Sequence, residues 1–210
     1  MQSGGPILVW GASGHAKVVA DLARTLGFVV IAFIDDDETR HGEKFFGANV
    51  THARHIESLR RESSRLALGV GDNRARERLF ERAKRLGFLM APLVHPSAYV
   101  APSATIGDGS VVLAHAVINA DARISLGAIV NTACIIEHDC FIGPFSHVSP
   151  GATLAGAVSV GQRVHVGAGA TVLPGVHIGD NAVVGAGAVA IDSVPPDSTV
   201  VGVPARRTKD

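Results

Sequence analysis

An aliphatic residue recurs at every sixth position through the second half of the chain, and this period constrains the fold more than any other feature. Its members are Val94, Val100, Ile106, Val112, Ile118, Ile124, Val130, Ile136, Ile142, Val148, Leu154, Val160, Val166, Val172, Ile178 and Val184. Four positions after each member stands a small or β-branched residue, from Ala98 to Ala188. A period of six fits neither an α-helix nor an alternating strand, but it is typical of a β-solenoid in which each hexapeptide forms one side of a coil. We therefore predict a stack of coils, each in contact only with its neighbours.

Residues 1–91 follow a different pattern, in which apolar runs alternate with segments of helical spacing. The apolar runs are Ile7–Trp10, Val29–Ile34 and Leu66–Val70, and the helical segments are Ala16–Leu26 and Arg74–Leu86. The predicted buried face of the first helical segment consists of Val18, Val19, Leu22, Ala23 and Leu26. Strands that alternate with helices predict a parallel sheet, so we expect a Rossmann-like α/β domain here.

Charge and proline content mark the point where one pattern replaces the other. Charged residues crowd the first part of the chain, whereas the stretch from Pro92 to Val194 is poor in charge and rich in glycine, alanine and valine. Pro92 and Pro96 punctuate the change. We therefore predict a Rossmann-like domain over 1–91, a solenoid over 92–194 and a C-terminal tail over 195–210.

Composition argues against several functional classes. Lys plus Arg equals Asp plus Glu at 19 each, so the chain lacks the basic balance typical of proteins that bind nucleic acid. No apolar stretch is long enough to span a bilayer, and Met1–Pro6 lacks the pattern of a secretory signal. Two cysteines, Cys134 and Cys140, are too few for a disulfide framework. We expect a cytoplasmic protein without membrane or nucleic-acid partners.

Several motifs, in their order along the chain, resemble one family of enzymes. The motifs are Trp10–Val19, Asp35–Asp36, Gly69–Asn73, Asn131, Glu137–Cys140, His147, Pro150–Ala152 and Gly202–Arg206. Together with the hexapeptide array they resemble the left-handed β-helix sugar acetyltransferases typified by PglD, perosamine N-acetyltransferase and sialic acid O-acetyltransferase. The resemblance covers nearly the whole chain. It implies acetyl-CoA as co-substrate, a nucleotide-linked 4-amino-4,6-dideoxy sugar as acceptor, and a homotrimer with active sites between subunits. Acetylation of a hydroxyl, as on a sialic acid, remains the alternative.

His138 and Asp139 are the candidate catalytic residues. Transfer of an acetyl group from a thioester to an amine needs a base for the amine proton, and histidine titrates near neutral pH. The adjacent carboxylate of Asp139 can orient the imidazole or stabilise its protonated form. The resemblance implies the same role, with the amine attacking the thioester directly.

The resemblance also assigns residues to the two substrates. It implies that Asn131 and His147 line the acceptor side of the site, with His147 near the acetyl group as well. It implies a backbone N–H, at Gly156, for the oxyanion. Coenzyme A is expected along the solenoid near His147, Gly156, Gly167, Ala168, Gly185, Ala186 and Arg206. Glycine and alanine at these positions are equally explained by the tight turns of the coils.

A glycine-containing loop in the first part of the chain predicts a phosphate site. Gly11, Ser13, Gly14 and His15 follow a predicted strand and open a predicted helix, where backbone N–H groups can bind an anion. The loop lacks the full dinucleotide fingerprint. The acidic pair Asp35–Asp36 ends the second strand, where a ribose or base would be recognised. With Gly71 and Asn73 after the Leu66–Val70 strand, these residues favour a nucleotide-sugar diphosphate over NAD.

Two other readings of the same residues stay open. Gamma-type carbonic anhydrases share the hexapeptide solenoid and bind zinc through histidines, which His138, His147 and His165 could supply. That class needs no nucleotide-binding domain, so we expect no metal. A non-catalytic solenoid that only binds a sugar nucleotide is the second reading, and it gives no reason for the His138–Asp139 pair.

Overall fold

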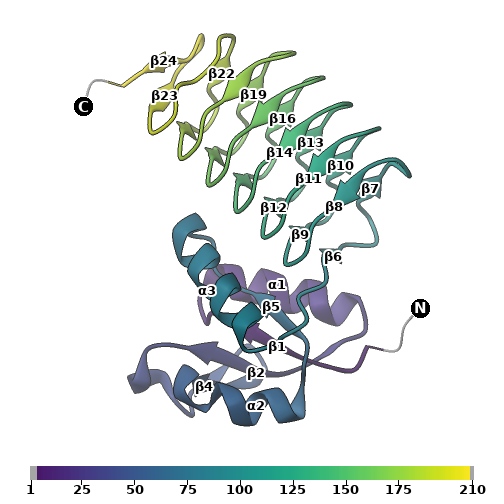
Figure 1. The fold of residues 1–210 in the computed structure, drawn as a ribbon, viewed down its shortest axis with the longest axis vertical. Coiled ribbons are helices and arrows are strands. Elements are labelled where there is room, and N and C mark those ends of the chain that lie inside the picture. Colours follow the sequence, from purple (N-terminus) through teal and green to yellow (C-terminus); the bar gives the residue numbers. More distant parts are fainter. Residues whose placement is uncertain (1–3, 209–210) are drawn as a thin grey trace. The chain divides into compact units, whose positions relative to one another are not determined.

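The computed structural model describes residues 4–208 and divides the chain into two compact units, Met1–Leu93 and Val94–Asp210. The first is an α/β unit and the second is a solenoid (Figure 1). The elements of the α/β unit are β1 (Pro6–Trp10), α1 (Gly14–Thr25), β2 (Val29–Asp35), β3 (Lys44–Phe45), β4 (Ala48–His52), α2 (Ile56–Glu62), β5 (Leu66–Leu68) and α3 (Asn73–Arg85). Single turns of 3₁₀ helix, Glu38–Arg40 and Ala53–His55, flank β3 and β4.

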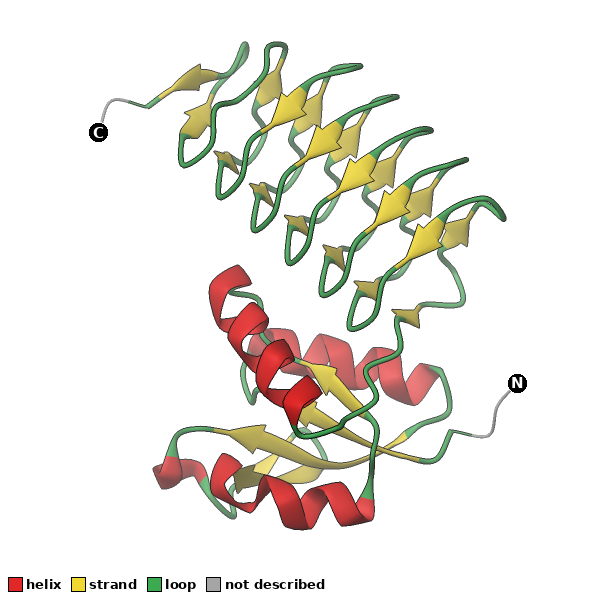
Figure 2. Cartoon of the chain, viewed as in Figure 1, coloured by secondary structure: helices red, strands yellow, loops and turns green. Residues whose placement is uncertain are grey.

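The sheet of the α/β unit has the strand order β3-β4-β2-β1-β5, and all its pairs except β3–β4 are parallel. Helices α1 and α3 cover one face of this sheet and α2 covers the other (Figure 2). The two strands that end at the cavity described below, β1 and β2, lie side by side in the middle of the sheet. The predicted Rossmann-like arrangement of a parallel sheet between helices is therefore present.

The buried face of α1 differs from the prediction. Its buried residues are Ala16, Val19, Ala20, Leu22 and Ala23, whereas Val18 is 43% exposed. The prediction of Val18 was wrong because the helix packs through alanines. Gly69 explains this choice, since a Cβ on Gly69 would lie 2.8 Å from the Cα and Cβ of Ala16. Helix and strand approach so closely that only small residues fit between them.

The solenoid consists of very short parallel strands joined by tight corners. They are β6 (Leu93–Val94), β7 (Tyr99–Val100), β8 (Thr105–Ile106), β9 (Val111–Val112), β10 (Val117–Ile118), β11 (Arg123–Ile124), β12 (Ile129–Val130), β13 (Ile135–Ile136), β14 (Phe141–Ile142), β15 (His147–Val148), β16 (Thr153–Leu154), β17 (Ser159–Val160), β18 (His165–Val166), β19 (Thr171–Val172), β20 (His177–Ile178), β21 (Val183–Val184), β22 (Val189–Ala190), β23 (Thr199–Val201) and β24 (Arg206–Arg207). Paired residues of successive coils are eighteen positions apart, as in Val117 opposite Ile135. Each coil therefore consists of three hexapeptides.

Three sheets form the sides of this left-handed parallel β-helix. Their strand orders are β22-β19-β16-β13-β10-β7, β20-β17-β14-β11-β8 and β24-β23-β21-β18-β15-β12-β9-β6. The aliphatic residue of each hexapeptide and the small residue four positions later both point into the core, as in Ile136 and Cys140 at 0% and 1% exposure. Because every layer repeats the same pair of side chains, the core is continuous along the solenoid axis.

The corners of the solenoid share one backbone conformation. From Gly109 to Gly187, every sixth residue has a positive φ, between 54° and 70°. Only some of these residues are glycine, and the others include Asp121, Asp139 and Phe145. The left-handed conformation is uncommon outside glycine, asparagine and aspartate, and here it bends the chain from one sheet into the next. Asp139 is therefore a corner residue as well as a candidate catalytic one.

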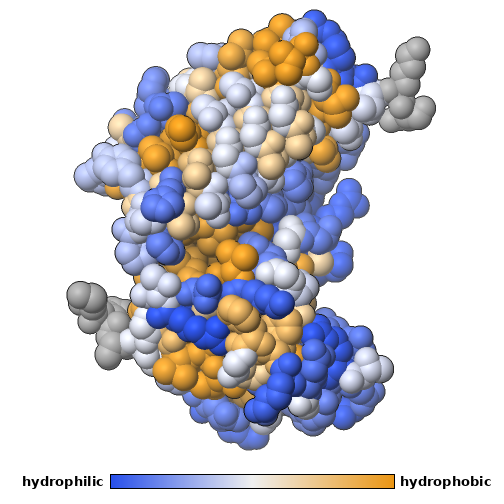
Figure 3. Space-filling view, turned by 180° about the vertical axis from the view of Figure 1, so that it is seen from behind, coloured by the Kyte–Doolittle hydropathy of each residue, from blue (hydrophilic) through white to orange (hydrophobic). Residues whose placement is uncertain are grey.

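Part of the predicted C-terminal tail belongs to the solenoid. Strand β23 pairs with β21 in parallel and β24 pairs with β23 in antiparallel fashion, so 199–207 extend one of the three sheets. Apolar side chains remain exposed at this end, among them Val201 and Val203. Figure 3 shows hydrophobic surface at this end of the solenoid. Within residues 4–208, no helix has the length and apolar character needed to cross a membrane.

Candidate functional site

His138 and Asp139 form a hydrogen-bonded pair at the corner between β13 and β14. The Nδ1 atom of His138 lies 2.7 Å from Oδ2 of Asp139, and both side chains are more than half exposed. The hydrogen bond to Asp139 is the main reason that the pKa of His138 lies above its usual value of 6.5, with further contributions from the charges of Asp139 and Glu137. Because Nδ1 is engaged with the carboxylate, Nε2 is the atom that remains for chemistry.

Gly156 lies directly against the imidazole of His138, one coil further along. A Cβ on Gly156 would come within 2.6 Å of both Cε1 and Nε2 of His138, so only glycine lets the ring rest there. Among the described residues, the backbone N–H of Gly156 donates no hydrogen bond. The same phase of the hexapeptide carries Pro144, Pro150 and Pro174, which have no N–H to donate. At this corner an outward N–H therefore stands next to the catalytic candidate.

The side chains of Asn131 and His147 are in contact at another corner of the solenoid. Asn131 follows β12 and precedes β13, and its Nδ2 lies 2.9 Å from Nε2 of His147 on β15. His165 on β18 stacks on His147, with ring centroids 4.9 Å apart, and its Nε2 lies 2.9 Å from Oγ of Ser149. The structure thus brings Asn131 and His147 together but separates them from His138, because the two groups lie at opposite ends of β13.

The residues predicted to contact coenzyme A fall mostly at the corner that also carries Asn131. Gly167, Ala168, Gly185 and Ala186 occupy it in later coils, and Ala168 and Ala186 are exposed. In the described residues the N–H groups of Ala168 and Ala186 donate no hydrogen bond, whereas those of Gly167 and Gly185 donate to the next coil. Gly167 has a structural explanation, since its Cβ would lie 2.5 Å from the backbone nitrogen of Ala186 in the next coil. Glycine at this position is required by the packing of the coils, whatever binds outside.

Arg206 lies at the end of the solenoid on β24, apart from the corner residues. Its guanidinium donates to the carbonyl oxygen of Ala205 at 2.9 Å and stands 3.9 Å from Asp192, in an exposed position. The zinc-site hypothesis requires His138, His147 and His165 to lie close together. His147 and His165 are neighbours, whereas His138 lies at the far end of β13. In residues 4–208, no group of three or more His, Cys, Asp or Glu side chains is arranged to hold a metal ion.

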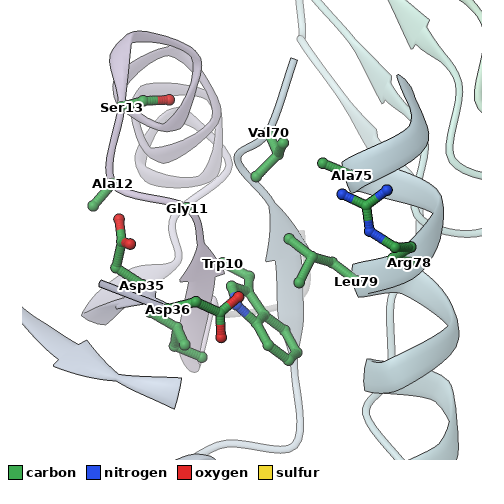
Figure 4. A pocket seen from close by; sticks show the side chains of 11 residues that line it. Trp10, Gly11, Ala12, Ser13, Asp35, Asp36, Val70, Ala75, Arg78 and Leu79 are labelled. Carbon is green, nitrogen blue, oxygen red and sulfur yellow. The ribbon is translucent and has the colours of Figure 1, made fainter. Parts of the chain in front are cut away.

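A cavity of about 280 Å³ opens at the carboxyl ends of β1 and β2 in the α/β unit. It is lined by Trp10, Gly11, Ala12, Ser13, Ile34, Asp35, Asp36, Val70, Ala75, Arg78 and Leu79. Figure 4 shows the two aspartates on one side of the cavity and the side chains of α3 (Ala75, Arg78 and Leu79) on the other. The predicted residues Gly11, Ser13, Asp35 and Asp36 thus surround one hollow at the end of a parallel sheet, where this class of fold binds ligands.

The loop before α1 leaves the helix N-terminus open. Ser13 is the N-cap residue, but its side chain makes no capping hydrogen bond, and a Cβ on Gly14 would meet nothing within 4 Å. Gly11 has a different role, because its φ is 115° and a Cβ on it would lie 2.7 Å from the carbonyl oxygen of Gly69, so that no side chain fits there. The first N–H groups of α1 are therefore available to an anion.

The two aspartates at the end of β2 are engaged with arginines. Arg40 donates to Oδ2 of Asp35 at 3.1 Å and to the carbonyl oxygen of Ala12 at 2.6 Å, and it also pairs with Glu43. Asp36 lies 3.2 Å from Arg82. The sequence predicts that Asp35 recognises the ribose or base. In the structure Asp35 lines the cavity and also binds Arg40, which links the end of β2 to the loop before α1.

His15, Gly71 and Asn73 gather around Arg76, a buried arginine of α3. Arg76 is 1% exposed and donates to the carbonyl oxygen of Gly71 at 2.9 Å and to Oδ1 of Asn73 at 2.8 Å. Burial lowers the pKa of His15 to about 4, and the nearby charge of Arg76 adds to the effect. His15 is therefore neutral at physiological pH, and the amide oxygen of Asn73 is already occupied by Arg76.

Sequence reasoning missed four residues of this region: Trp10, Arg40, Arg76 and Arg78. Trp10 is 1% exposed, and its Nε1 is buried without a hydrogen-bond partner among the described residues. Trp10 begins the Trp10–Val19 motif and ends an apolar run beside the glycine loop, but neither feature marks its side chain as part of a cavity. No local signal marks the three arginines, because Arg40 reaches a carbonyl 28 residues away and the others lie in a helix rich in charge.

Comparison with known proteins matches a described family in part of each unit. Residues 6–83 match the family described as the PglD N-terminal domain, and residues 157–190 match the hexapeptide repeat of succinyl-transferase. UDP-N-acetylbacillosamine N-acetyltransferase of Bacillus subtilis (strain 168) is 40% identical over 112 residues. This match covers 51% of each chain, so it spans about half the length of that curated relative.

Two solved structures match over almost the whole chain. One is a histidine-to-asparagine variant of perosamine N-acetyltransferase from Caulobacter crescentus in complex with CoA and GDP-perosamine, 41% identical over 98% of both chains with a TM-score of 0.94. The other is the acetyltransferase domain of PglB from Neisseria gonorrhoeae FA1090 in complex with acetyl coenzyme A. It is 39% identical, covers 97% of this chain and 98% of that one, and has a TM-score of 0.89. The chain therefore belongs to the family of hexapeptide-repeat acetyltransferases that includes these two proteins.

Proposed function

We propose that the protein transfers an acetyl group from acetyl-CoA to the 4-amino group of a nucleotide-linked 4-amino-4,6-dideoxy sugar. The observation that carries the proposal is the His138–Asp139 pair, bonded at 2.7 Å at a corner where Gly156 leaves room for the ring. The names of the relatives support the reaction class. The Caulobacter crescentus protein is named a perosamine N-acetyltransferase and the Bacillus subtilis protein a UDP-N-acetylbacillosamine N-acetyltransferase. The Caulobacter crescentus and Neisseria gonorrhoeae structures hold CoA and acetyl coenzyme A, respectively.

In the proposed reaction, His138 is the general base. Asp139 holds the proton on Nδ1, so that the lone pair of Nε2 takes a proton from the sugar amine as its nitrogen attacks the thioester carbonyl. The carboxylate then stabilises the imidazolium that forms. The tetrahedral intermediate carries a negative oxygen, and the outward N–H of Gly156 is our candidate donor to it. When the intermediate collapses, the carbon–sulfur bond breaks and the thiolate of coenzyme A leaves.

The cavity of the α/β unit is the proposed site of the nucleotide. The uncapped N-terminus of α1, at Ser13 and Gly14, offers N–H groups and a helix dipole to the diphosphate. The apolar walls formed by Ile34, Val70 and Leu79 suit a flat base, and Asp36 suits its polar edge. Arg78, an exposed cation at the cavity, complements the negative charge of the ligand.

A homotrimer with shared active sites completes the proposal. His138 and the Asn131–His147 group lie at opposite ends of β13, so a single copy cannot bring both to one substrate, whereas a neighbouring copy can supply the missing group. The sheet between them presents an uncharged outer row: Tyr99, Val117, Ile135, Thr153, Thr171 and Val189. The outward N–H groups of Ala168 and Ala186 are then candidate donors to the amides of coenzyme A, with Arg206 toward its phosphates.

We also infer that the protein works in the cytoplasm, where acetyl-CoA is available. Cys134 and Cys140 support this inference, since both are buried free thiols. Burial raises the pKa of Cys134 to about 12, so this thiol is unreactive.

The experiment incubates the purified protein with acetyl-CoA and a panel of UDP-, GDP- and dTDP-4-amino-4,6-dideoxy sugars, and follows the release of free thiol. We compare the wild type with His138→Ala and with a control, His177→Ala. The control removes an exposed histidine on β20, away from the His138–Asp139 corner. We expect thiol release with one sugar, a loss of 10²- to 10⁴-fold in kcat/KM for His138→Ala, on the order typical of a general base, and wild-type rates for His177→Ala.

Three other outcomes would contradict parts of the proposal. Turnover of a sialic acid and of no amino sugar would replace N-acetylation by O-acetylation. Full activity in His138→Ala would remove the assigned base. Folded protein that neither turns over nor binds acetyl-CoA would refute the enzymatic proposal and leave a binding module.

A further inference from the structure

A second group of joined polar side chains lies outside the His138–Asp139 corner, and its role is not explained by the reaction alone. It consists of Asn131, His147, Ser149 and His165. His147 and His165 are paired residues of neighbouring strands, and their rings stack with centroids 4.9 Å apart and planes inclined by 36°. On its other side His147 is paired with Ile129, which is 0% exposed. The imidazole of His147 is therefore held between an aliphatic residue and a second imidazole.

The contact with Asn131 reveals where the proton of His147 lies. The Oδ1 atom of Asn131 accepts the backbone N–H of Thr132 at 2.8 Å, which fixes the orientation of the amide. The NH₂ group, a donor only, then faces Nε2 of His147 at 2.9 Å. Nε2 must accept this hydrogen bond, so it carries no proton. His147 is the neutral tautomer protonated at Nδ1.

His165 repeats the arrangement one coil further along, with Ser149 in the place of Asn131. The hydroxyl of Ser149 lies 2.9 Å from Nε2 of His165, and Ser149 itself is 4% exposed. This hydrogen bond limits rotation of the His165 ring, which in turn covers one face of the His147 ring. The order of contacts runs from Ser149 through His165 and His147 to Asn131.

We propose that His165 is a positioning residue: with Ser149 it keeps the His147 imidazole against Asn131 in the Nδ1-protonated tautomer. On the proposed function, on which this inference rests, His147 then lies on the acetyl-CoA side of the site as a neutral imidazole of fixed orientation and not as a second base, since its Nδ1 atom is buried and its Nε2 atom is engaged by Asn131. The hydrogen-bond partner of each histidine decides which of its ring nitrogens carries the proton. A carboxylate makes His138 a proton acceptor at Nε2, and an amide makes His147 a proton carrier at Nδ1.

The test reads the tautomer directly. Long-range ¹H–¹⁵N spectra of the labelled full chain at neutral pH report the protonation of each imidazole nitrogen, and the His147 signals are assigned by their loss in His147→Asn. We expect Nδ1 protonated and Nε2 bare in the wild type. In His165→Leu we expect a mixture of tautomers and a rise of about tenfold in KM for acetyl-CoA with a smaller change in kcat. His165→Gln, which can still bond Ser149, should restore much of both.

Ser149→Ala serves as a second variant in case His165→Leu does not fold, and His177→Leu is the control for loss of a histidine elsewhere. A proton on Nε2 of His147 in the wild type overturns the proposal. So does a His147 tautomer that stays unchanged in both His165→Leu and Ser149→Ala. The spectra need no substrate, so a shifted tautomer in a protein that transfers no acetyl group would refute the proposed function and leave the positioning role intact.

Discussion

The cavity of the α/β unit and the corner of the solenoid hold their candidate residues by different means. Around the cavity, no contact is repeated elsewhere among the described residues of the unit. Arg40 binds Ala12 and Asp35, and Arg76 binds Gly71 and Asn73. The backbone of Gly11 packs closely against that of Gly69. At the solenoid corner, the backbone around His138 is the same backbone that recurs every six residues. A candidate residue at the cavity therefore also holds the local fold together, whereas at the corner the repeated coil fixes the backbone and the candidate side chains are exposed.

We therefore expect substitutions in the two regions to affect stability and activity differently. Substitutions of the candidate side chains at solenoid corners, such as His138 and Asp139, are expected to change activity while the free energy of unfolding stays nearly constant, because these side chains are exposed. Substitutions at the glycines and arginines of the α/β unit are expected to change both quantities. The following experiments would break or sharpen the comparison.

The largest effect is expected for Gly11→Ala in the α/β unit. The new Cβ would lie 2.7 Å from the carbonyl oxygen of Gly69 at a φ of 115°, so we expect a loss of about 3 kcal/mol or more in the free energy of unfolding. Urea unfolding followed by the fluorescence of Trp10 measures it. Gly14→Ala is the matched control, because its Cβ meets nothing within 4 Å. Gly14→Ala should keep its stability and raise the KM for the sugar nucleotide; a stable Gly11→Ala would refute the role of the close approach.

Asp139→Asn should reduce kcat by about tenfold to a hundredfold, since the amide holds the His138 tautomer less firmly. The hydrogen bond to Asp139 raises the pKa of His138 above 6.5, and a base must be unprotonated to work, so the wild-type rate falls as pH drops through that raised pKa. Without the carboxylate the pKa falls, and the acid limb of the kcat/KM profile should move to lower pH.

Asp121→Asn is the control for Asp139→Asn. Asp121 stands one coil earlier with the same φ of 60°, but alanine precedes it in place of histidine. Its pH profile should match the wild type. An acid limb that moves equally in both variants would attribute the effect to net charge and not to the pair.

Arg40→Gln is expected to have an intermediate effect. The loss of the bonds to Ala12 and Asp35 loosens the loop before α1, so the KM for the sugar nucleotide should rise by about tenfold while kcat changes less. Arg54→Gln, which removes an exposed arginine paired with Glu38, is the control. Equal KM values in the wild type and Arg40→Gln would show that the loop keeps its shape without the arginine.

The smallest effect is expected at Ala133, a corner residue that is not itself a candidate. Ala133 has a φ of 54°, and its replacement by glycine relieves the left-handed strain, so Ala133→Gly should stabilise the protein by about 0.5–1 kcal/mol. Ala120→Gly, at an ordinary corner position, should destabilise it by a similar amount. Thermal unfolding measures both, and a loss of stability in Ala133→Gly would mean that the coil sets this conformation without strain.

The period of six predicted the solenoid well because the same aliphatic position recurs in every hexapeptide. A misassigned residue at one position would therefore leave the repeat recognisable from the others. The same argument fails for the left-handed corner residues, since the coil imposes that conformation on residues as different as Phe145 and Arg163. In α1, one residue such as Val18 has no repeat to correct it. Arg40 and Arg76 could not be predicted, because their partners are selected by tertiary approach and not by spacing.

The eighteen-residue coil also fixes the position of each corner along the solenoid axis. Strands in a sheet are about 4.8 Å apart, so the insertion or deletion of one coil ahead of His138 would slide the pair of His138 and Asp139 along the axis by that step while leaving the corner itself unchanged. The number of coils therefore sets, in steps of about 4.8 Å, where along the solenoid axis the candidate catalytic pair lies.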